Sequence, residues 1–138
     1  MSGARALAAA ARALVGTPFR PGGRDPNSGL DCFGVLHAAL RAIGTEPLLP
    51  ARYRLRKLAL PDLDPWLAAN RLARCSGTVL AGDVLLLQWG PAQPHCAIVT
   101  QRGFVHAHAG LRRVVESPGA PPRPTLCHAR LGDLRRAD

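Results

Sequence analysis

Three residues of this sequence, Cys32, His95 and His106, have the types that nucleophilic catalysis by a cysteine requires. A cysteine peptidase needs a thiolate, a base beside it that later returns a proton to the leaving amine, and a third polar group that orients the base. The three residues lie far apart along the chain, so only the fold can bring them together. The elements that carry them are therefore the first thing to predict.

Cys32 stands at the boundary between a loop and a helix. A Gly/Pro/Asn-rich approach ends at Asp31, and the apolar positions behind it have the spacing of one helix face: Cys32, Leu36, Ala39, Leu40 and Ile43. This pattern predicts a helix over 32–43, with Asp31 as N-cap and Gly44 at its end. In a first helical turn, free N–H groups and the helix dipole favour a thiolate over a thiol. The alternative for such a cysteine is a small buried hydrophobe.

The rest of the first half predicts two more helices and two loops. We expect a first helix over 4–15 and a third over 65–74, the latter behind Asp64 as its cap. The segments 17–29 and 46–61 are interrupted by proline or glycine, and we expect both to be loops at the surface or packed against it.

The second half of the chain changes to an extended pattern. Apolar runs separated by short turns predict four strands, at about 84–89, 95–100, 104–108 and 114–116. The proline-rich tail from Ser117 is expected to be a loop or strap, with a short edge strand near 126–129. Helices first and an antiparallel sheet second predict an α+β fold, in a single domain over 1–138.

Strand parity decides whether the histidines can meet. If the second and third strands form a hairpin with a loop of two or four residues, His95 and His106 lie on one face of the sheet. A loop of odd length without a bulge would put them on opposite faces. His108 has the same parity as His106, so parity alone leaves both as candidates for the third residue.

Composition limits the class of protein and its partners. No run of ~18 apolar residues is present, as a membrane span would need, and Arg12 interrupts the apolar N-terminal stretch, so we expect neither a membrane span nor an export signal. The formal net charge of +9 favours polyanionic partners such as nucleic acid, acidic cell-wall polymers or an acidic protein face. The four cysteines form no Cys-x-x-Cys pair, and reduced thiols are expected.

Five short motifs, in this order, resemble those of the NlpC-type cell-wall cysteine peptidases, papain-like enzymes of bacteria and phages. They are Gly16-Thr17-Pro18-Phe19 with Gly22-Gly23, Asp31-Cys32-Phe33-Gly34, Gly82-Asp83-Val84, His95-Cys96-Ala97-Ile98 and Val105-His106-Ala107. Two further runs are most similar to the small phage-tail and gene-transfer-agent branch: Gly23-Arg24-Asp25-Pro26 and Arg113-Val114-Val115-Glu116.

The resemblance implies a papain-like NlpC-type fold and a role for each site residue. Cys32 would attack a peptide carbonyl, His95 would serve as base and then acid, and His106, or alternatively His108, would orient His95. The residues expected at the substrate are Phe19, Asp31, Phe33 and Gly34. The family usually has a tyrosine where Phe19 stands and often a serine where Phe33 stands, so substrate preference can differ.

The resemblance also implies a substrate and a place of action. The family hydrolyses stem peptides of peptidoglycan, typically beside D-glutamate and diaminopimelate, and no metal or organic cofactor is expected. The branch implies tail hub or baseplate proteins as partners. The protein would be made in the cytoplasm without a signal peptide and act at the cell wall or in the periplasm, as part of a phage-like tail particle.

Other interpretations remain beside this one. The chain could be a structural tail-tip module with little or no activity, or a papain-like amidase or acyltransferase. His106-x-His108 could supply two zinc ligands, but no second ligand pair accompanies it. The run Arg52 to Lys57 could contact nucleic acid, although Tyr53 alone is a thin stacking platform. Of the remaining candidates, His37 is assigned to the surface and Cys75 and Cys96 to packing, and no role is expected for His128.

Overall fold

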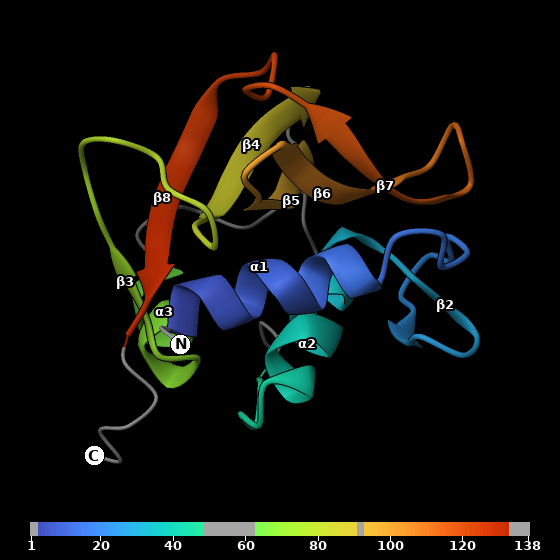
Figure 1. Ribbon diagram of the computed structural model, residues 1–138, viewed down its shortest axis with the longest axis horizontal. Helices are drawn as coiled ribbons and strands as arrows, with labels where there is room; N and C mark the ends of the chain where they lie inside the picture. Colours follow the sequence, from blue (N-terminus) through green and yellow to red (C-terminus); the bar gives the residue numbers. More distant parts are fainter. Residues whose placement is uncertain (1–2, 49–62, 91–92, 133–138) are drawn as a thin grey trace.

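The computed structural model describes residues 3–48, 63–90 and 93–132 of the chain. This part contains the helices α1 (Gly3–Ala13), α2 (Cys32–Ala42) and α3 (Leu63–Ala69). The strands are β1 (Arg24–Asp25), β2 (Gly29–Leu30), β3 (Leu72–Arg74), β4 (Val84–Gly90), β5 (Gln93–Val99), β6 (Gly103–His108), β7 (Arg113–Pro118) and β8 (Thr125–Leu131). Figure 1 shows α1 and α2 packed together on one side of the sheet. The predicted α+β fold is confirmed. None of the described helices is long and apolar enough to cross a bilayer.

The main sheet is antiparallel and has six strands in the order β3-β8-β4-β5-β6-β7. Strands β4 to β7 follow one another as a meander, as predicted. The prediction of a short edge strand at 126–129 is wrong, because β8 lies inside the sheet between β3 and β4. Alternate residues of β8 are buried, which are Cys127, Ala129 and Leu131, so the strand has one face on the core. The prolines stop before the strand begins.

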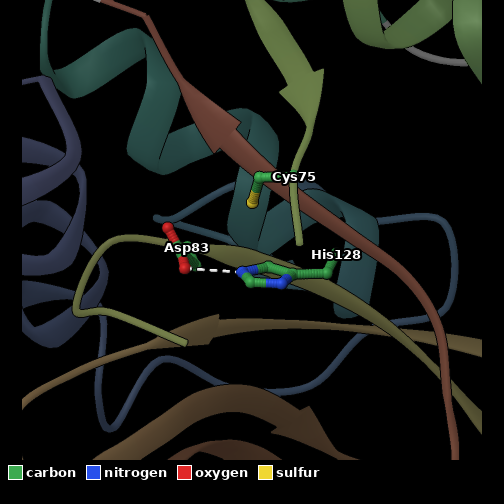
Figure 2. Close-up of side chains that lie close together, drawn as sticks. All are labelled: Cys75, Asp83 and His128. Atoms are coloured by element: carbon green, nitrogen blue, oxygen red, sulfur yellow. Dashed lines mark hydrogen bonds and ion pairs between the residues drawn. The ribbon is translucent and has the colours of Figure 1, made fainter. Parts of the chain in front are cut away.

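A buried ion pair ties β8 to the start of β4. Asp83, which is 0 % exposed, directly precedes β4, and its carboxylate accepts hydrogen bonds from His128 Nε2 at 2.6 Å and from Arg130 Nε at 2.7 Å. A further bond comes from the backbone N–H of Leu80 at 2.8 Å. Figure 2 shows His128 reaching Asp83 beside Cys75. Assigning His128 to no role was wrong, because it helps to hold the last strand of the sheet.

Helix α2 begins and ends where the sequence predicts. The Oδ1 atom of Asp31 accepts a hydrogen bond from the Gly34 N–H at 2.8 Å, which caps the first turn. Behind the last helical residue, Gly44 adopts a φ of +93°, a conformation that favours glycine. Cys32 is therefore the first residue of the helix, as expected.

The predictions for the neighbouring segments were partly wrong. The third helix ends at Ala69 rather than Arg74, because Arg71 turns the chain with a φ of 62° and residues 72–74 then pair with β8 as β3. The expected loop 17–29 contains the small hairpin of β1 and β2. Most of the expected excursion 46–61 lies outside the described residues.

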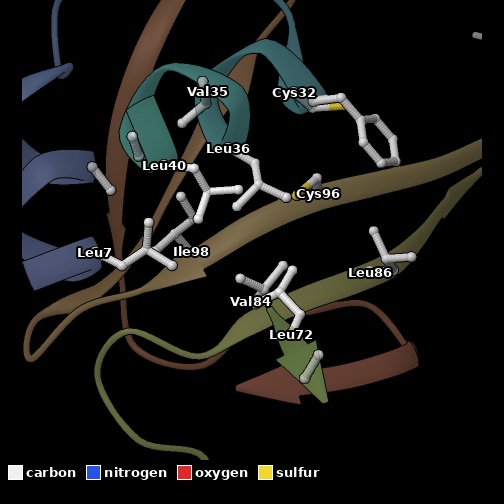
Figure 3. Packing of buried hydrophobic residues seen from close by; sticks show 14 of the residues in the cluster. Leu7, Cys32, Val35, Leu36, Leu40, Leu72, Val84, Leu86, Cys96 and Ile98 are labelled. Carbon is white, nitrogen blue, oxygen red and sulfur yellow. The ribbon is translucent and has the colours of Figure 1, made fainter. Parts of the chain in front are cut away.

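The sheet has a core on each face. The larger core lies between the sheet and the helices, and Figure 3 shows Leu36 of α2 above Cys96 and Ile98 of β5. The smaller core lies on the opposite face and consists of Leu85, Leu87, Ala97 and Phe104, with Trp89 and Val99 at its border. A sheet residue that belongs to the larger core therefore points toward the helices, and one that belongs to the smaller core points away from them.

Candidate active site

The two predicted histidines meet on one face of the sheet. Strands β5 and β6 pair with Ile98 opposite Val105, and the backbone N–H of Thr100 bonds to Gly103 O at 2.8 Å across a two-residue turn. This even-length turn gives His95 and His106 the same parity. The His95 Nε2 and His106 Nδ1 atoms lie 2.9 Å apart and share a hydrogen bond.

A third group continues the chain of hydrogen bonds. His106 Nε2 lies 2.9 Å from the hydroxyl oxygen of Ser117 on β7. Ser117 stands opposite Phe104 in the register of β6 and β7 and is half-buried. Sequence reasoning missed Ser117 because the fourth strand was predicted to end at Glu116, one residue too early for the parity argument to include it.

Aromatic rings enclose the two histidines. Trp89 tilts over His95 with 4.5 Å between ring centroids, and Phe104 lies 4.7 Å from the His106 ring. Burial lowers the pKa of His95 to about 3, helped by the nearby His106 and His108. Burial, together with His108, lowers the pKa of His106 to about 4. Both rings are therefore neutral near pH 7, and each has one protonated and one unprotonated ring nitrogen.

His108 lies outside this hydrogen-bond chain. Its Nδ1 atom accepts a bond from the backbone N–H of Leu111 at 3.0 Å, and its ring centroid is 5.8 Å from that of His106. The geometry therefore favours His106 over His108 as the residue that orients His95.

Cys32 lies where α2 meets β5. The residue is buried in the larger core together with Cys96, and both are visible in Figure 3. Burial raises the pKa of the Cys96 thiol, and Cys32 raises it further, which places Cys32 close to the residue that follows His95. Side chains alternate along a strand, so Cys96 faces α2 while His95 shares the opposite face with its β4 partner Leu87.

A catalytic contact between Cys32 and His95 therefore has to form around the beginning of β5. His95 itself pairs regularly with Leu87, and the irregularity of this strand pair lies on β4, between Gln88 and Gly90. The contact between the Cys32 sulfur and the His95 ring stays a prediction.

Comparison with solved structures supplies the fold family. The chain is similar to the crystal structure of the NlpC/p60 domain of the peptidoglycan hydrolase SagA, with 27 % sequence identity and a TM-score of 0.56, over 84 % of this chain and 89 % of that one. The protein has an NlpC/p60-type, papain-like fold. No protein-family model and no curated protein sequence matches the chain. The structural likeness supports the NlpC resemblance and leaves the phage-tail branch as an expectation.

Within this NlpC/p60-type fold, residues expected at the substrate shape the loop that precedes Cys32. The Asp31 carboxylate is buried and also bonds to the Gly22 N–H and to Arg24 Nη1, both at 2.9 Å. A Cβ atom at Gly34 would lie 2.0 Å from Gly23 O, so only glycine lets the loop pack on α2.

The two phenylalanines differ in their access to a ligand. Phe33 is 0 % exposed and packs edge-on against Trp66 with 5.7 Å between ring centroids, so its side chain supports the turn rather than presenting a wall to substrate. Phe19 is half-buried, and its N–H bonds to Arg112 O at 2.9 Å. Of the two aromatic positions, only Phe19 has side-chain surface that a substrate can reach.

The cluster of Cys75, Asp83 and His128 is the place in the described ranges where three potential metal ligands come together, with their atoms within 4.8 Å of one another. Two observations argue against a metal ion at this cluster. Arg130 bonds to both Asp83 oxygens and brings a positive charge to the position of a cation. Burial and Asp83 raise the pKa of the Cys75 thiol, whereas zinc binds thiolate. The cluster is better explained as the anchor of β8.

A cavity of about 600 Å³ opens on the side of α2 that carries His37 and Arg41. Arg24 and Asp25 of β1 line its other wall. Burial, followed by the charges of Arg24 and Arg41, lowers the pKa of His37. His37 was expected at the surface, and the structure places it half-buried in this cavity instead.

Proposed function

We propose that the protein is a cysteine peptidase that hydrolyses peptide bonds in the stem peptides of peptidoglycan. Cys32 is the nucleophile, His95 the base and then the acid, and His106 the residue that orients His95. The observation that carries the proposal is the 2.9 Å hydrogen bond between His95 and His106 on a sheet against which the Cys32 helix packs. The likeness to an NlpC/p60 domain of a peptidoglycan hydrolase supports the substrate class.

The reaction follows from the protonation states of these groups. The neutral His95 ring takes the proton of the Cys32 thiol as the sulfur attacks the peptide carbonyl. The backbone N–H of Cys32 and the N-terminal end of α2 stabilise the oxyanion that forms. His95 returns the proton to the leaving amine, and water, activated by the same ring, then hydrolyses the thioester to release the acid and restore the thiol.

The low pKa of His95 has a consequence for the nucleophile. Burial disfavours the imidazolium, so the proton moves to His95 only when a negative charge, first on sulfur and then on the oxyanion, lies close to the ring. Negative charge on sulfur and on the oxyanion is therefore what makes protonation of His95 favourable during the reaction.

The place of action is also part of the proposal. We propose that the domain reaches the cell wall within a phage-like tail particle, on the motifs shared with that branch. The second of these motifs begins at Arg113, which forms a bridge with Pro18 of the loop that precedes Cys32. The net charge of +9 favours docking to acidic tail proteins or wall polymers, and a purely structural module would use the same surface.

The test is the release of new amines from purified peptidoglycan. Wild type should release them, and Cys32→Ala and His95→Ala should not. Equal release by wild type and Cys32→Ala would overturn the proposal. Mass spectrometry of the products separates the classes, because a peptidase leaves a free carboxylate and amine whereas an acyltransferase leaves a new amide. Unimpaired infection or transfer by particles that carry Cys32→Ala would favour the structural module.

A further inference from the structure

The inference concerns how the base acquires the correct tautomer, and it rests on the proposed function. His95 Nε2, His106 Nδ1, His106 Nε2 and the Ser117 oxygen form one linear chain with two contacts of 2.9 Å. A neutral imidazole has one N–H donor and one acceptor nitrogen. The position of one proton in this chain therefore fixes the position of all the others.

Only two arrangements of protons satisfy both contacts. In the first, His95 Nε2–H donates to His106 Nδ1, His106 Nε2–H donates to Ser117, and the lone pair of His95 lies on Nδ1. In the second, Ser117 donates to His106 Nε2, His106 Nδ1–H donates to His95 Nε2, and Nδ1 of His95 carries the proton. Only the first leaves His95 with a base on the ring nitrogen that His106 does not use.

The catalytic step requires the first arrangement. When His95 takes the thiol proton, both of its nitrogens carry hydrogen, and His95 Nε2–H must find an acceptor. In the second arrangement it would face the N–H of His106 at 2.9 Å, with two protons between two nitrogens. His106 must therefore accept at Nδ1 and, being neutral, donate at Nε2.

Ser117 is the group that accepts this hydrogen bond from His106 Nε2–H. His106 is 2 % exposed, which leaves its ring almost no access to bulk water. The rings that contact His106 in the described part of the chain belong to Phe104, Trp89, His95 and His108. His108 already accepts from Leu111, and Glu116, next to Ser117, pairs with Arg12. Leaving a buried N–H without an acceptor destabilises the folded state by the full desolvation penalty of that group.

We propose that Ser117 is a positioning residue that accepts the Nε2–H of His106 and thereby holds the lone pair of His95 on Nδ1, available to the Cys32 thiol. Without the hydroxyl, the N–H of His106 moves to Nδ1, and the second arrangement becomes populated at His95. All catalytic residues are then still present, but in a large share of molecules His95 carries its proton on Nδ1 and cannot accept one from Cys32.

The direct test is the tautomer of His95, read from ¹⁵N chemical shifts and ring ¹H–¹⁵N correlations at pH 7 in the Cys32→Ala protein. The expected result is a protonated Nε2 and an unprotonated Nδ1 for both histidines. Ser117→Ala should shift both rings toward protonated Nδ1, and Ser117→Thr, which keeps the hydroxyl, should restore the original state. Ser76→Ala removes an exposed hydroxyl elsewhere and is the matched control.

Kinetics on peptidoglycan fragments provide the second measurement. Ser117→Ala should lower kcat about ten- to a hundredfold with little change in KM, and Ser117→Thr should recover most of this loss. A His95 ring protonated on Nδ1 in the Ser117-containing protein would overturn the proposal, as would a Ser117→Ala variant with unchanged tautomers and kcat. The tautomer measurement does not depend on whether Cys32 is the nucleophile, because it is made on the Cys32→Ala protein. Failure of the proposed function would instead show as absent cleavage or as cleavage independent of Cys32.

Discussion

Acidification should destabilise the protein through His106. The ring is 2 % exposed, and its pKa of about 4 lies well below the ordinary value of 6.5 that it has in the unfolded chain. Between these values the unfolded state binds more protons than the folded state, so the free energy of unfolding falls as the pH falls. The folded and unfolded pKa values of His106 differ by about 2.5 units, and each unit corresponds to about 1.4 kcal/mol of stability. At pH 4 the folded ring is already half protonated, so the free energy of unfolding falls by about 3 kcal/mol between pH 7 and pH 4.

The measurement is urea unfolding at a series of pH values, with wild type beside His106→Asn. The asparagine variant keeps hydrogen-bonding groups on the side chain but cannot titrate, so its stability should fall less between pH 6.5 and pH 4. The contribution of His37 is common to both proteins. The difference between the two curves therefore reports His106 together with its effect on His95, whose pKa His106 helps to lower. The pKa of Asp83 is lowered from 3.8, so that carboxylate titrates below this window. Parallel curves for the two proteins would refute the reasoning.

Three further outcomes are expected. Cys32 should be the thiol that iodoacetamide labels fastest near neutral pH, because burial raises the pKa of each of the other three cysteines; peptide mapping of the first labelled product checks this. His106→Ala should lose most of kcat, whereas His108→Ala should keep most of it, since His106 bonds to His95 and His108 bonds to Leu111 instead. Steady-state assays of both variants on peptidoglycan fragments check this. Asp83→Ala should lower the free energy of unfolding by about 2 kcal/mol, measured in urea at pH 7, because His128 and Arg130 lose the buried carboxylate to which they bond.

Local patterns predicted the elements that carry the site. Asp31 and Gly44 mark the ends of α2 through capping chemistry that needs no knowledge of the remaining fold. Sequence reasoning was sufficient for these helix ends. It left the shared face of His95 and His106 open, because that face depends on the length of one turn, which the structure shows to have two residues.

Other features depend on partners that are distant in the chain. The position of β8 is set by pairing with β3 and β4 and by the contact of His128 with Asp83, 45 residues away. The hairpin of β1 and β2 has two residues in each strand, too few for any periodic pattern to predict. Ser117 was missed for a similar reason, because its role depends on which strand lies beside β6. The catalytic roles themselves stay predictions.

The position of β8 also shapes how this protein folds as it is synthesised. The meander of β4 to β7 emerges from the ribosome first and can pair with itself, but the outer edge of β4 stays open until residues 125–131 follow. Strand β3, made earlier, has no neighbour in the sheet until the same moment. A nascent chain stalled before Thr125 would thus leave β3 and the outer edge of β4 without the strand that lies between them, and it would bind chaperones or self-associate. The late addition of β8 pairs with both.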